Sequence, residues 1–199
     1  MTFRQRGIGW VLAMLLLGSG VPVAAQPAVT VAGVAYAPRA ALAGSDLVLN
    51  GAGVRYKAVF QVYAAGLYLP ARADTPQGVA ALPGPKRLSI TMLRAIDSAE
   101  LGTLFTRGIE DNLDKAAFSQ IVPAVLRMGE LFAATRRLAP GDQITVDWLP
   151  GTGTVITVKG LPQGEPFREA GFFDALMGIW LGPRPADWKL KDALLGRAG

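Results

Sequence analysis

Alternation of apolar and polar residues marks three segments of the chain as β-strands. In Lys86–Arg94, Leu, Ile and Met alternate with Ser and Thr, so that one side of the segment is buried and the other is polar. The same period of two runs through 144–148 and again through 154–159. Because the turn sequence Pro150–Gly153 separates these last two segments, they predict a β-hairpin.

The first half of the chain also has the composition of strands. The segments 29–36, 46–49 and 54–69 are rich in β-branched and aromatic residues. The sequence Asn50–Gly53, with its two glycines, predicts a turn between the second and the third segment, and Gly66 predicts a bend within the third.

Apolar residues recur at helical intervals in the middle of the chain. Asp97 and Glu100 have the spacing of a capping box, which predicts that a helix begins there. An apolar stripe follows, formed by Leu101, Leu104, Phe105 and Ile109. A second stripe, from Phe118 to Phe132, predicts another helix, with Asp114-Lys115 in the connection and Pro123 either in a first turn or at a break.

Two further helices are predicted near the C-terminus, in Ala170–Leu181 and Asp187–Leu195, separated by Gly and Pro residues. Strands, then helices, then a hairpin, then helices is the element order of an α+β domain, in which helices pack on one face of an antiparallel sheet. No repeat, low-complexity tract or linker divides residues 26–199, so we expect them to form one domain.

The N-terminus has the order of a secretory signal peptide. Arg4 and Arg6 precede an apolar run over 8–17, and helix-breaking Gly and Pro residues then lead to the small residues Ala24-Ala25. The run is shorter than a membrane span, so an uncleaved membrane anchor is the less favoured alternative. We therefore expect residues 1–25 to be removed and the rest to act in the periplasm or as a secreted protein, with no transmembrane span after cleavage.

The absence of two residue types limits the chemistry that the chain can perform. It contains no His and no Cys, which excludes Ser-His-Asp and Cys-His catalysis, imidazole and thiolate metal sites, and disulfides. We therefore expect no metal and no cofactor. Without Arg4 and Arg6 the formal charge falls from +5 to +3, and the adjacent basic pairs, Lys86-Arg87 and Arg136-Arg137, are too few to predict a nucleic-acid site.

Three parts of the sequence resemble the chalcone isomerase-like family. The first is Leu49–Arg55 together with Val62–Leu69, which is similar to the family's glycine turn, its arginine, and a strand that ends in Gly-aliphatic-Tyr-aliphatic. The second is Ile90–Arg94, which runs into the predicted helix start. The third, over 172–196, resembles the C-terminal helix pair of the bacterial members. The resemblance covers most of residues 30–196.

The resemblance implies a fold and a class of function. The family's fold is an open-faced sandwich, in which a large antiparallel sheet carries a layer of helices on one face and a ligand cleft lies between the two. Plant members close a flavanone ring, whereas other members bind fatty acids and catalyse nothing known. The arginine that matches Arg55 stabilises the oxyanion in the isomerase and is thought to hold a carboxylate in the binding proteins.

The other polar positions of the isomerase are matched less well. Tyr63 stands where the isomerase has a threonine, and Asn112 matches a helix asparagine. Leu101 and Ile179 stand where the enzyme has a tyrosine and a threonine. The resemblance therefore implies Arg55, Tyr63 and Asn112 as ligand-binding residues, and it favours binding over catalysis.

The residues themselves leave other roles open. Arg55 could belong to a structural ion pair, and Tyr63 could be a core residue. If 54–69 is one straight strand, these two side chains lie on the same side of it but roughly 26 Å apart, at about 3.3 Å per residue. They can share a ligand only if the chain turns back between them, and 56–62 contains no turn residue.

Three functions follow as hypotheses. The first is a non-catalytic binder of a fatty acid or a similar amphipathic acid, with Arg55 as the charged anchor of an apolar cleft. The alternative is an isomerase or intramolecular lyase for an unsaturated carbonyl compound, with Arg55 as oxyanion stabiliser and Tyr63 as proton donor. The third is an envelope accessory protein without a small ligand. A long apolar cleft favours the first, several hydroxyls beside the arginine favour the second, and a filled core favours the third.

The predicted signal peptide can be tested directly. N-terminal sequencing of the protein from the periplasmic or secreted fraction should give a start at or near Gln26, because the small residues before it fit a signal peptidase. A chain that still begins with Met1 and is recovered in the membrane pellet would instead establish the anchor.

Overall fold

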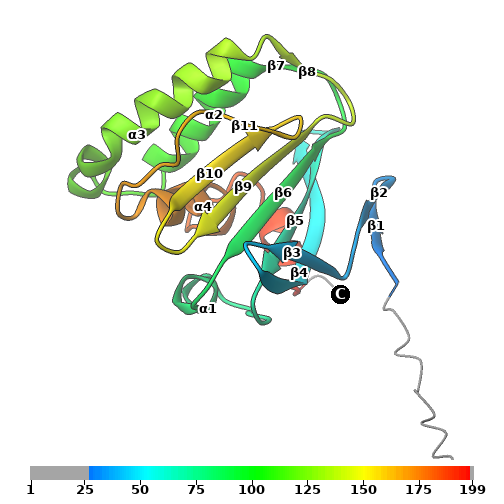
Figure 1. Cartoon of the computed structure of the whole chain (residues 1–199). Helices are drawn as coiled ribbons and strands as arrows, with labels where there is room; N and C mark the ends of the chain where they lie inside the picture. Colours follow the sequence, from blue (N-terminus) through cyan, green and yellow to red (C-terminus); the bar gives the residue numbers. More distant parts are fainter. Residues whose placement is uncertain (1–26, 198–199) are drawn as a thin grey trace, which may run out of the picture.

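A computed structural model of the chain describes residues 27–197, and its largest element is an antiparallel sheet of seven strands (Figure 1). The spatial order of the strands is β11-β10-β9-β6-β5-β4-β3. Their bounds are β3 (Arg39–Leu42), β4 (Ser45–Lys57), β5 (Phe60–Leu69), β6 (Lys86–Met92), β9 (Gln143–Leu149), β10 (Gly153–Val158) and β11 (Leu161–Pro162). The predicted hairpin of β9 and β10 is confirmed, whereas the predicted signal peptide lies outside the described residues.

Helices cover one face of this sheet, as the element order predicts (Figure 1). They are α2 (Ser98–Glu110), α3 (Lys115–Ala134), α4 (Phe172–Leu181) and α5 (Trp188–Leu194), and a short α1 (Pro76–Ala81) precedes β6. The helix start predicted at Asp97 is confirmed, because this residue is the N-cap of α2 and accepts hydrogen bonds from its first turn. Asp114, which was expected in the connection, is the N-cap of α3, and Lys115 is the first residue of that helix. The fold is therefore the expected α+β open-faced sandwich. None of the helices among residues 27–197 is long and apolar enough to cross a membrane.

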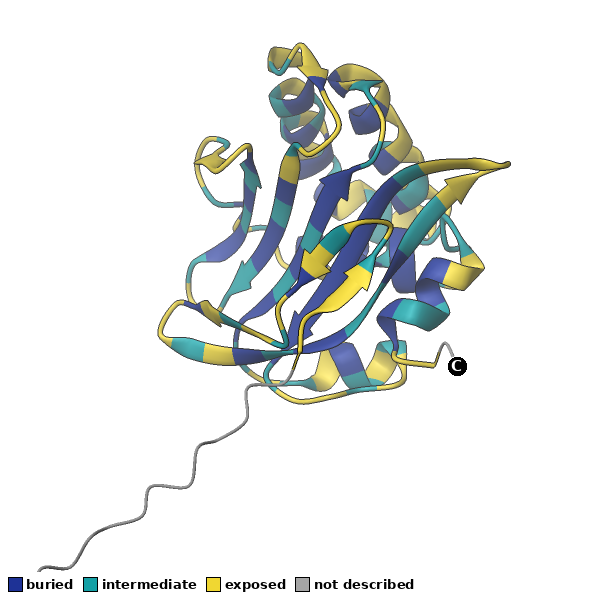
Figure 2. Cartoon of the chain, turned by 90° about the vertical axis from the view of Figure 1, so that its right-hand side faces the viewer, coloured by how far each residue is buried: buried dark blue, intermediate teal, exposed yellow. Residues whose placement is uncertain are grey.

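The main core lies between the sheet and the helices. Three aromatic side chains from three helices meet there, since the ring of Phe105 lies 5.4 Å from that of Phe132 and 5.3 Å from that of Trp180, both edge-to-face. On the sheet side, Leu88 and Ile90 of β6 are fully buried. Figure 2 shows this burial as dark blue along the central strands.

A second, smaller core lies on the opposite face of the sheet. The segment 29–36, predicted as one strand, is a hairpin of β1 (Val29–Val31) and β2 (Val34–Tyr36). The ring of Tyr36 lies against Gly66, where an added Cβ would come within 2.5 Å of it. The bend predicted at Gly66 is therefore wrong, because this glycine makes room for an aromatic ring within the regular strand β5.

The turn predicted at 50–53 is also wrong, because β4 passes through these residues. Gly51 and Gly53 face α5, which lies directly on the strand. A Cβ at Gly51 would collide with the carbonyl oxygen of Ala193, and one at Gly53 would lie 2.6 Å from the Ala193 Cβ. These glycines permit close helix–strand packing rather than a turn.

Polar side chains fix both ends of α5 to β4. At its C-terminal end, the buried Asn50 side chain donates from Nδ2 to the carbonyl oxygen of Leu194 at 2.7 Å. At its N-terminal end, the N-cap Asp187 accepts from the backbone N–H of Lys189 at 2.8 Å through Oδ1 and from that of Tyr56 at 2.9 Å through Oδ2. The helix is thereby held in one position along the strand.

Contrary to the prediction, the segment 54–69 is not one strand. It contains the end of β4, a two-residue loop and the whole of β5, which form a hairpin. Lys57 and Phe60 are the last paired residues, so the loop consists of Ala58 and Val59 alone. Ala58 has a φ of 53°, in the left-handed region that Gly and Asn usually occupy in such loops. Because neither residue is a usual turn former, the composition gave no signal for this turn.

Smaller differences concern elements with weak local signals. No local sequence pattern indicated β3, α1 or the two-stranded sheet of β7 (Ile96–Asp97) and β8 (Arg137–Leu138). Pro123 was expected in a first turn or at a break, but it lies inside a continuous α3. It is on the exposed side of the helix, where water can hydrogen-bond to the carbonyl that proline leaves without a partner.

The close packing of α5 on β4 predicts the effect of two glycine substitutions. Gly51→Ala should lower the free energy of unfolding by about 2–3 kcal/mol, because the new methyl group meets rigid backbone. Gly129→Ala is the matched control, since nothing lies within 4 Å of its Cβ position in α3, and it should raise stability by about 0.5–1 kcal/mol. Chemical denaturation measures both, and equal effects of the two substitutions would contradict the packing described.

Candidate functional site

A cleft of about 970 Å³ lies where the loop end of the β4–β5 hairpin meets α2 and the segment after α4. Its apolar lining consists of Ala58, Phe60, Val62, Ala95, Ile96, Leu101, Leu104, Phe105, Ile179, Pro185 and Ala186. Its charged lining consists of Arg55, Lys57, Arg94, Arg107, Arg136, Arg137 and Arg184, with Asp97, Glu100 and Asp111. Tyr63 supplies the one hydroxyl among the described residues that line it. The cleft therefore combines apolar side chains with an excess of positively charged ones.

The structure brings Arg55 and Tyr63 together. They are directly opposite each other in the register of β4 and β5, and both line the cleft. Paired residues on antiparallel strands have Cα atoms about 4.5–5.5 Å apart, so the separation of roughly 26 Å expected for a straight strand is wrong. The turn at Ala58 and Val59 is the reason.

Tyr63 is a buried phenol with one fixed hydrogen bond. Its oxygen accepts from Trp180 Nε1 of α4 at 2.8 Å. Burial raises the pKa of Tyr63 to about 12, against the lowering effects of the Trp180 hydrogen bond and the nearby Arg55 charge. Because the Trp180 N–H takes one lone pair, the hydroxyl proton remains available to an acceptor in the cleft. At neutral pH Tyr63 is therefore a hydrogen-bond donor rather than an anion.

Arg55 is half-buried and only loosely paired. Its Nη1 lies 3.7 Å from Oδ2 of Asp187, and the two side chains are 23% and 11% exposed. Within the described part of the chain the Arg55 guanidinium donates no hydrogen bond. Asp187, in contrast, already accepts backbone hydrogen bonds at the start of α5 and from Tyr56. The guanidinium can therefore turn to an anion in the cleft without leaving Asp187 unpaired.

Positive charge is concentrated around the cleft. Seven Arg and Lys side chains line it, against three Asp and Glu. Residues 27–197 carry a formal charge of +3 in total, so the excess of positive charge lies at the cleft and the rest of the surface is close to balanced. Low-dielectric walls strengthen the field of such a group, which favours an anionic ligand.

Asn112 lies outside this cleft. Its Nδ2 donates to the carbonyl oxygens of Gly108 at 2.8 Å and Arg184 at 3.0 Å, and its Oδ1 accepts from the Arg184 N–H at 2.8 Å. It therefore joins the end of α2 to the segment after α4. The structure does not bring it to Arg55 and Tyr63.

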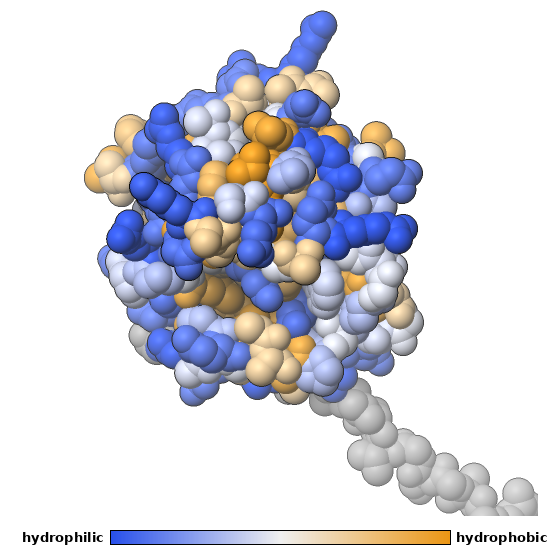
Figure 3. Space-filling model, turned by 90° about the vertical axis from the view of Figure 1, so that its left-hand side faces the viewer, coloured by the Kyte–Doolittle hydropathy of each residue, from blue (hydrophilic) through white to orange (hydrophobic). Residues whose placement is uncertain are grey.

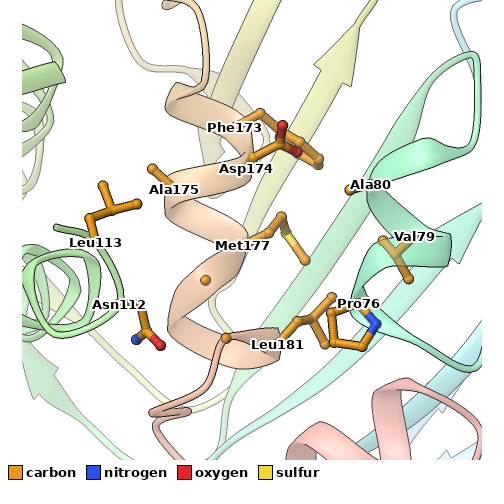
Figure 4. A pocket seen from close by; sticks show the side chains of 12 residues that line it. Pro76, Val79, Ala80, Asn112, Leu113, Phe173, Asp174, Ala175, Met177 and Leu181 are labelled. Atoms are coloured by element: carbon orange, nitrogen blue, oxygen red, sulfur yellow. The ribbon is translucent and has the colours of Figure 1, made fainter. Parts of the chain in front are cut away.

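Asn112 instead lines a smaller hollow of about 210 Å³ between α1, α4 and the end of α2. Figure 4 shows Asn112 on one side of α4, with Val79 and Pro76 of α1 on the other. Figure 3 shows apolar side chains within a hollow among the hydrophilic ones on this side of the molecule. The amide of Asn112 is occupied by backbone groups, so it serves the fold here.

Sequence reasoning missed most of the charged lining. The cations come from five separate parts of the chain, and the adjacent pair Arg136-Arg137 was set aside as too small a group. The fold joins this pair to Arg94, whose guanidinium carbon lies 4.8 Å from the centre of the Phe60 ring. Trp180, which is fully buried, is also the hydrogen-bond donor to Tyr63. No single-sequence pattern indicates such long-range pairing.

Comparisons with known proteins bear on the family and the fold. A family model described as chalcone isomerase-like matches residues 28–196. No curated protein matches the sequence significantly. Among solved structures, the chain is similar to a fatty-acid binding protein from Arabidopsis thaliana, with a TM-score of 0.63 and 16% sequence identity, over 83% of this chain and 93% of that chain. At this identity the likeness concerns the fold, and it confirms the predicted fold class.

The buried phenol predicts a specific dependence of stability on pH. An unfolded chain ionises tyrosine near pH 10 and the folded chain ionises Tyr63 near pH 12, so stability is unaffected below about pH 10 and falls between about 10 and 12. Tyr63→Phe should be less stable than wild type by about 1–3 kcal/mol at pH 7, because Trp180 loses its acceptor. Between about pH 10 and 12 the stability of Tyr63→Phe should decline less steeply than that of wild type. The two slopes should differ by up to about 1.4 kcal/mol per pH unit.

Urea denaturation at a series of pH values measures both effects. Tyr36 and Tyr68 also have a raised pKa because they are buried, so the comparison of Tyr63→Phe with wild type is required to isolate one phenol. Parallel declines of the two proteins above pH 10 would show that Tyr63 ionises as freely as in the unfolded chain.

Proposed function

This chain belongs to the chalcone isomerase-like family, and on that premise we propose that it is a non-catalytic binder of a fatty acid or a similar amphipathic acid. The observation that carries the proposal is the cleft between sheet and helices, which has an apolar wall and Arg55 beside Tyr63. Its volume is within the range of roughly 300–1,000 Å³ that is usual for pockets of small ligands.

The apolar wall suits an acyl chain. Each methylene that leaves water contributes about 0.8 kcal/mol, so burial of the chain supplies most of the affinity. The wall combines side chains of the sheet, such as Val62, with Leu101 and Phe105 of α2 and Ile179 of α4. The chain would lie between the two layers of the fold.

Arg55 and Tyr63 suit the acid group. A guanidinium offers a planar pair of donors to a carboxylate, and it keeps its charge at any physiological pH. The Tyr63 hydroxyl adds a third donor from the neighbouring strand. A half-buried cation is costly without a close anion, and Asp187 at 3.7 Å meets this need incompletely. A ligand carboxylate would complete the pairing.

The fold of the similar plant protein also supports this proposal, since that protein is described as a fatty-acid binding protein. We further propose that the protein acts in the periplasm or as a secreted protein, following the signal peptide expected in residues 1–25. Neither a metal nor a cofactor enters the proposal.

An isomerase acting on an unsaturated carbonyl compound is the second candidate, because the Arg55–Tyr63 pair combines an oxyanion stabiliser with a proton donor. Two observations favour binding instead. A phenol with a pKa of about 12 is a weak acid at neutral pH. Tyr63 also supplies the one hydroxyl among the described lining residues, with the apolar Leu101 and Ile179 nearby. The open cleft does not favour the accessory-protein hypothesis.

Titration calorimetry with dodecanoate and dodecanol tests the role of Arg55. Arg55→Ala should lower the affinity for dodecanoate about tenfold or more and change the affinity for dodecanol by less than about twofold, because only the acid pairs with the cation. Arg55→Lys should recover part of the loss, since an ammonium cannot donate to both carboxylate oxygens at once in the planar geometry. The stability of Arg55→Ala should stay within about 1 kcal/mol of wild type, because its ion pair is long and partly exposed.

Arg72→Ala is the matched control, because Arg72 is exposed and lies outside the cleft lining. It should bind both ligands as wild type does. Equal losses for acid and alcohol in Arg55→Ala would assign Arg55 to the fold. Failure of wild type to bind either ligand would contradict the proposed function, and turnover of a hydroxychalcone that Arg55→Ala abolishes would establish the isomerase.

A further inference from the structure

The tip of the β4–β5 hairpin exposes apolar side chains to solvent. Val59 is 82% exposed and Phe60 is 57% exposed, at the end of a long hairpin (Figure 2). Two-residue hairpin loops usually contain polar turn formers such as Asn-Gly, whereas here Ala58 adopts a φ of 53° beside a valine. Neither the turn nor the core requires an apolar residue at Val59.

Cations line the cleft beside this tip. Lys57, Arg94, Arg136 and Arg137 belong to the same cleft lining as Phe60, and all four are exposed. The Arg94 guanidinium lies over the Phe60 ring at 4.8 Å, so the aromatic and the cationic groups are in contact. Asp97 and Glu100 are the acids of this lining that are closest in sequence to Arg94, and cations outnumber acids in the whole lining by seven to three.

We propose that this tip, defined as Lys57–Phe60, inserts into the surface of an anionic phospholipid bilayer, with the neighbouring cations on the lipid phosphates. Exposed aliphatic and aromatic side chains enter the boundary between headgroups and acyl chains, while adjacent Lys and Arg are attracted to anionic lipid. This docking goes beyond the binding of an acid in the cleft and does not require a bound ligand. It would bring the mouth of the cleft against the membrane.

The shape and charge of the tip favour a bilayer over other partners. A stable protein interface buries about 800 Å² on each side, which a two-residue loop and its neighbours do not offer as a flat surface. A nucleic acid would use the cations but would leave Val59 in water. A bilayer accommodates a narrow apolar projection and a ring of cations together.

Vesicle co-sedimentation tests the proposal with the expressed chain. Wild type and variants carry the same N-terminus, so residues 1–25 contribute equally whether present or removed. Wild type should bind vesicles of phosphatidylglycerol mixed with phosphatidylcholine at least about tenfold more tightly than vesicles of phosphatidylcholine alone, and high salt should weaken this binding. Equal binding to both vesicles would overturn the electrostatic part of the proposal, and no binding to either would overturn the whole.

Two variants assign the binding to the tip and its cations. Val59→Ser should weaken binding about fivefold to tenfold, because it removes apolar surface from the tip. Arg136→Glu with Arg137→Glu should weaken it about tenfold or more. The matched controls are Leu161→Ser, at an exposed apolar residue of β11, and Arg72→Glu with Arg168→Glu, at exposed cations outside the cleft lining.

Controls that bind as weakly as the tip variants would overturn the assignment to the tip. Thermal unfolding verifies that each variant is folded, which the exposure of all these side chains favours. Val59 is outside the cleft lining, so Val59→Ser should bind dodecanoate like wild type. Loss of vesicle binding with intact dodecanoate binding separates this proposal from the proposed function, and the reverse result would contradict only the latter.

Discussion

The packing of α5 directly on β4 is the constraint on which the rest of the site depends. Gly51 and Gly53 allow the helix backbone to approach the strand, and any Cβ there would collide with Ala193. Asn50 holds one end of the helix through Leu194. Because the length of the helix is fixed, its other end falls beside the end of β4. The sequence that resembled a turn therefore sets the position of a helix.

This position of α5 determines the surroundings of Arg55. Asp187, the N-cap of α5, lies 3.7 Å from the guanidinium and also accepts from the Tyr56 N–H. The two-residue loop of the β4–β5 hairpin then places Tyr63 opposite Arg55, where Trp180 of α4 fixes its hydroxyl. A helix cap, a hairpin loop and a core aromatic residue thus together determine the surroundings of one arginine. If 54–69 were a single straight strand, Tyr63 would not lie opposite Arg55.

The sequence predicted secondary structure correctly where one hydrophobic period, of a strand or of a helix, dominates. The prediction was wrong where one residue type, such as glycine, can serve two structural roles. The β9–β10 hairpin and the helix cap at Asp97 follow from local patterns, and the structure has them. A glycine, however, can permit a turn or a close contact, and only the partner in space decides which. The turn at Ala58 was not predicted, because this two-residue loop contains no residue that usually favours such a turn. The cations of the cleft were missed because they meet only after folding.

The charged groups at the cleft differ in how far the fold already pairs them. Asp187 accepts hydrogen bonds from backbone N–H groups at a helix start, so these hydrogen bonds do not depend on Arg55. Arg55 is the half-buried cation of the lining, whereas Lys57, Arg94, Arg107, Arg136, Arg137 and Arg184 are exposed to water and screened by salt. Under the proposed function, the exposed cations would act mainly on the approach of the anionic ligand, and Arg55 on its final position. The fold pairs the Asp187 carboxylate with backbone N–H groups and leaves Arg55 only partly paired. This is the charge distribution that an acid-binding site requires.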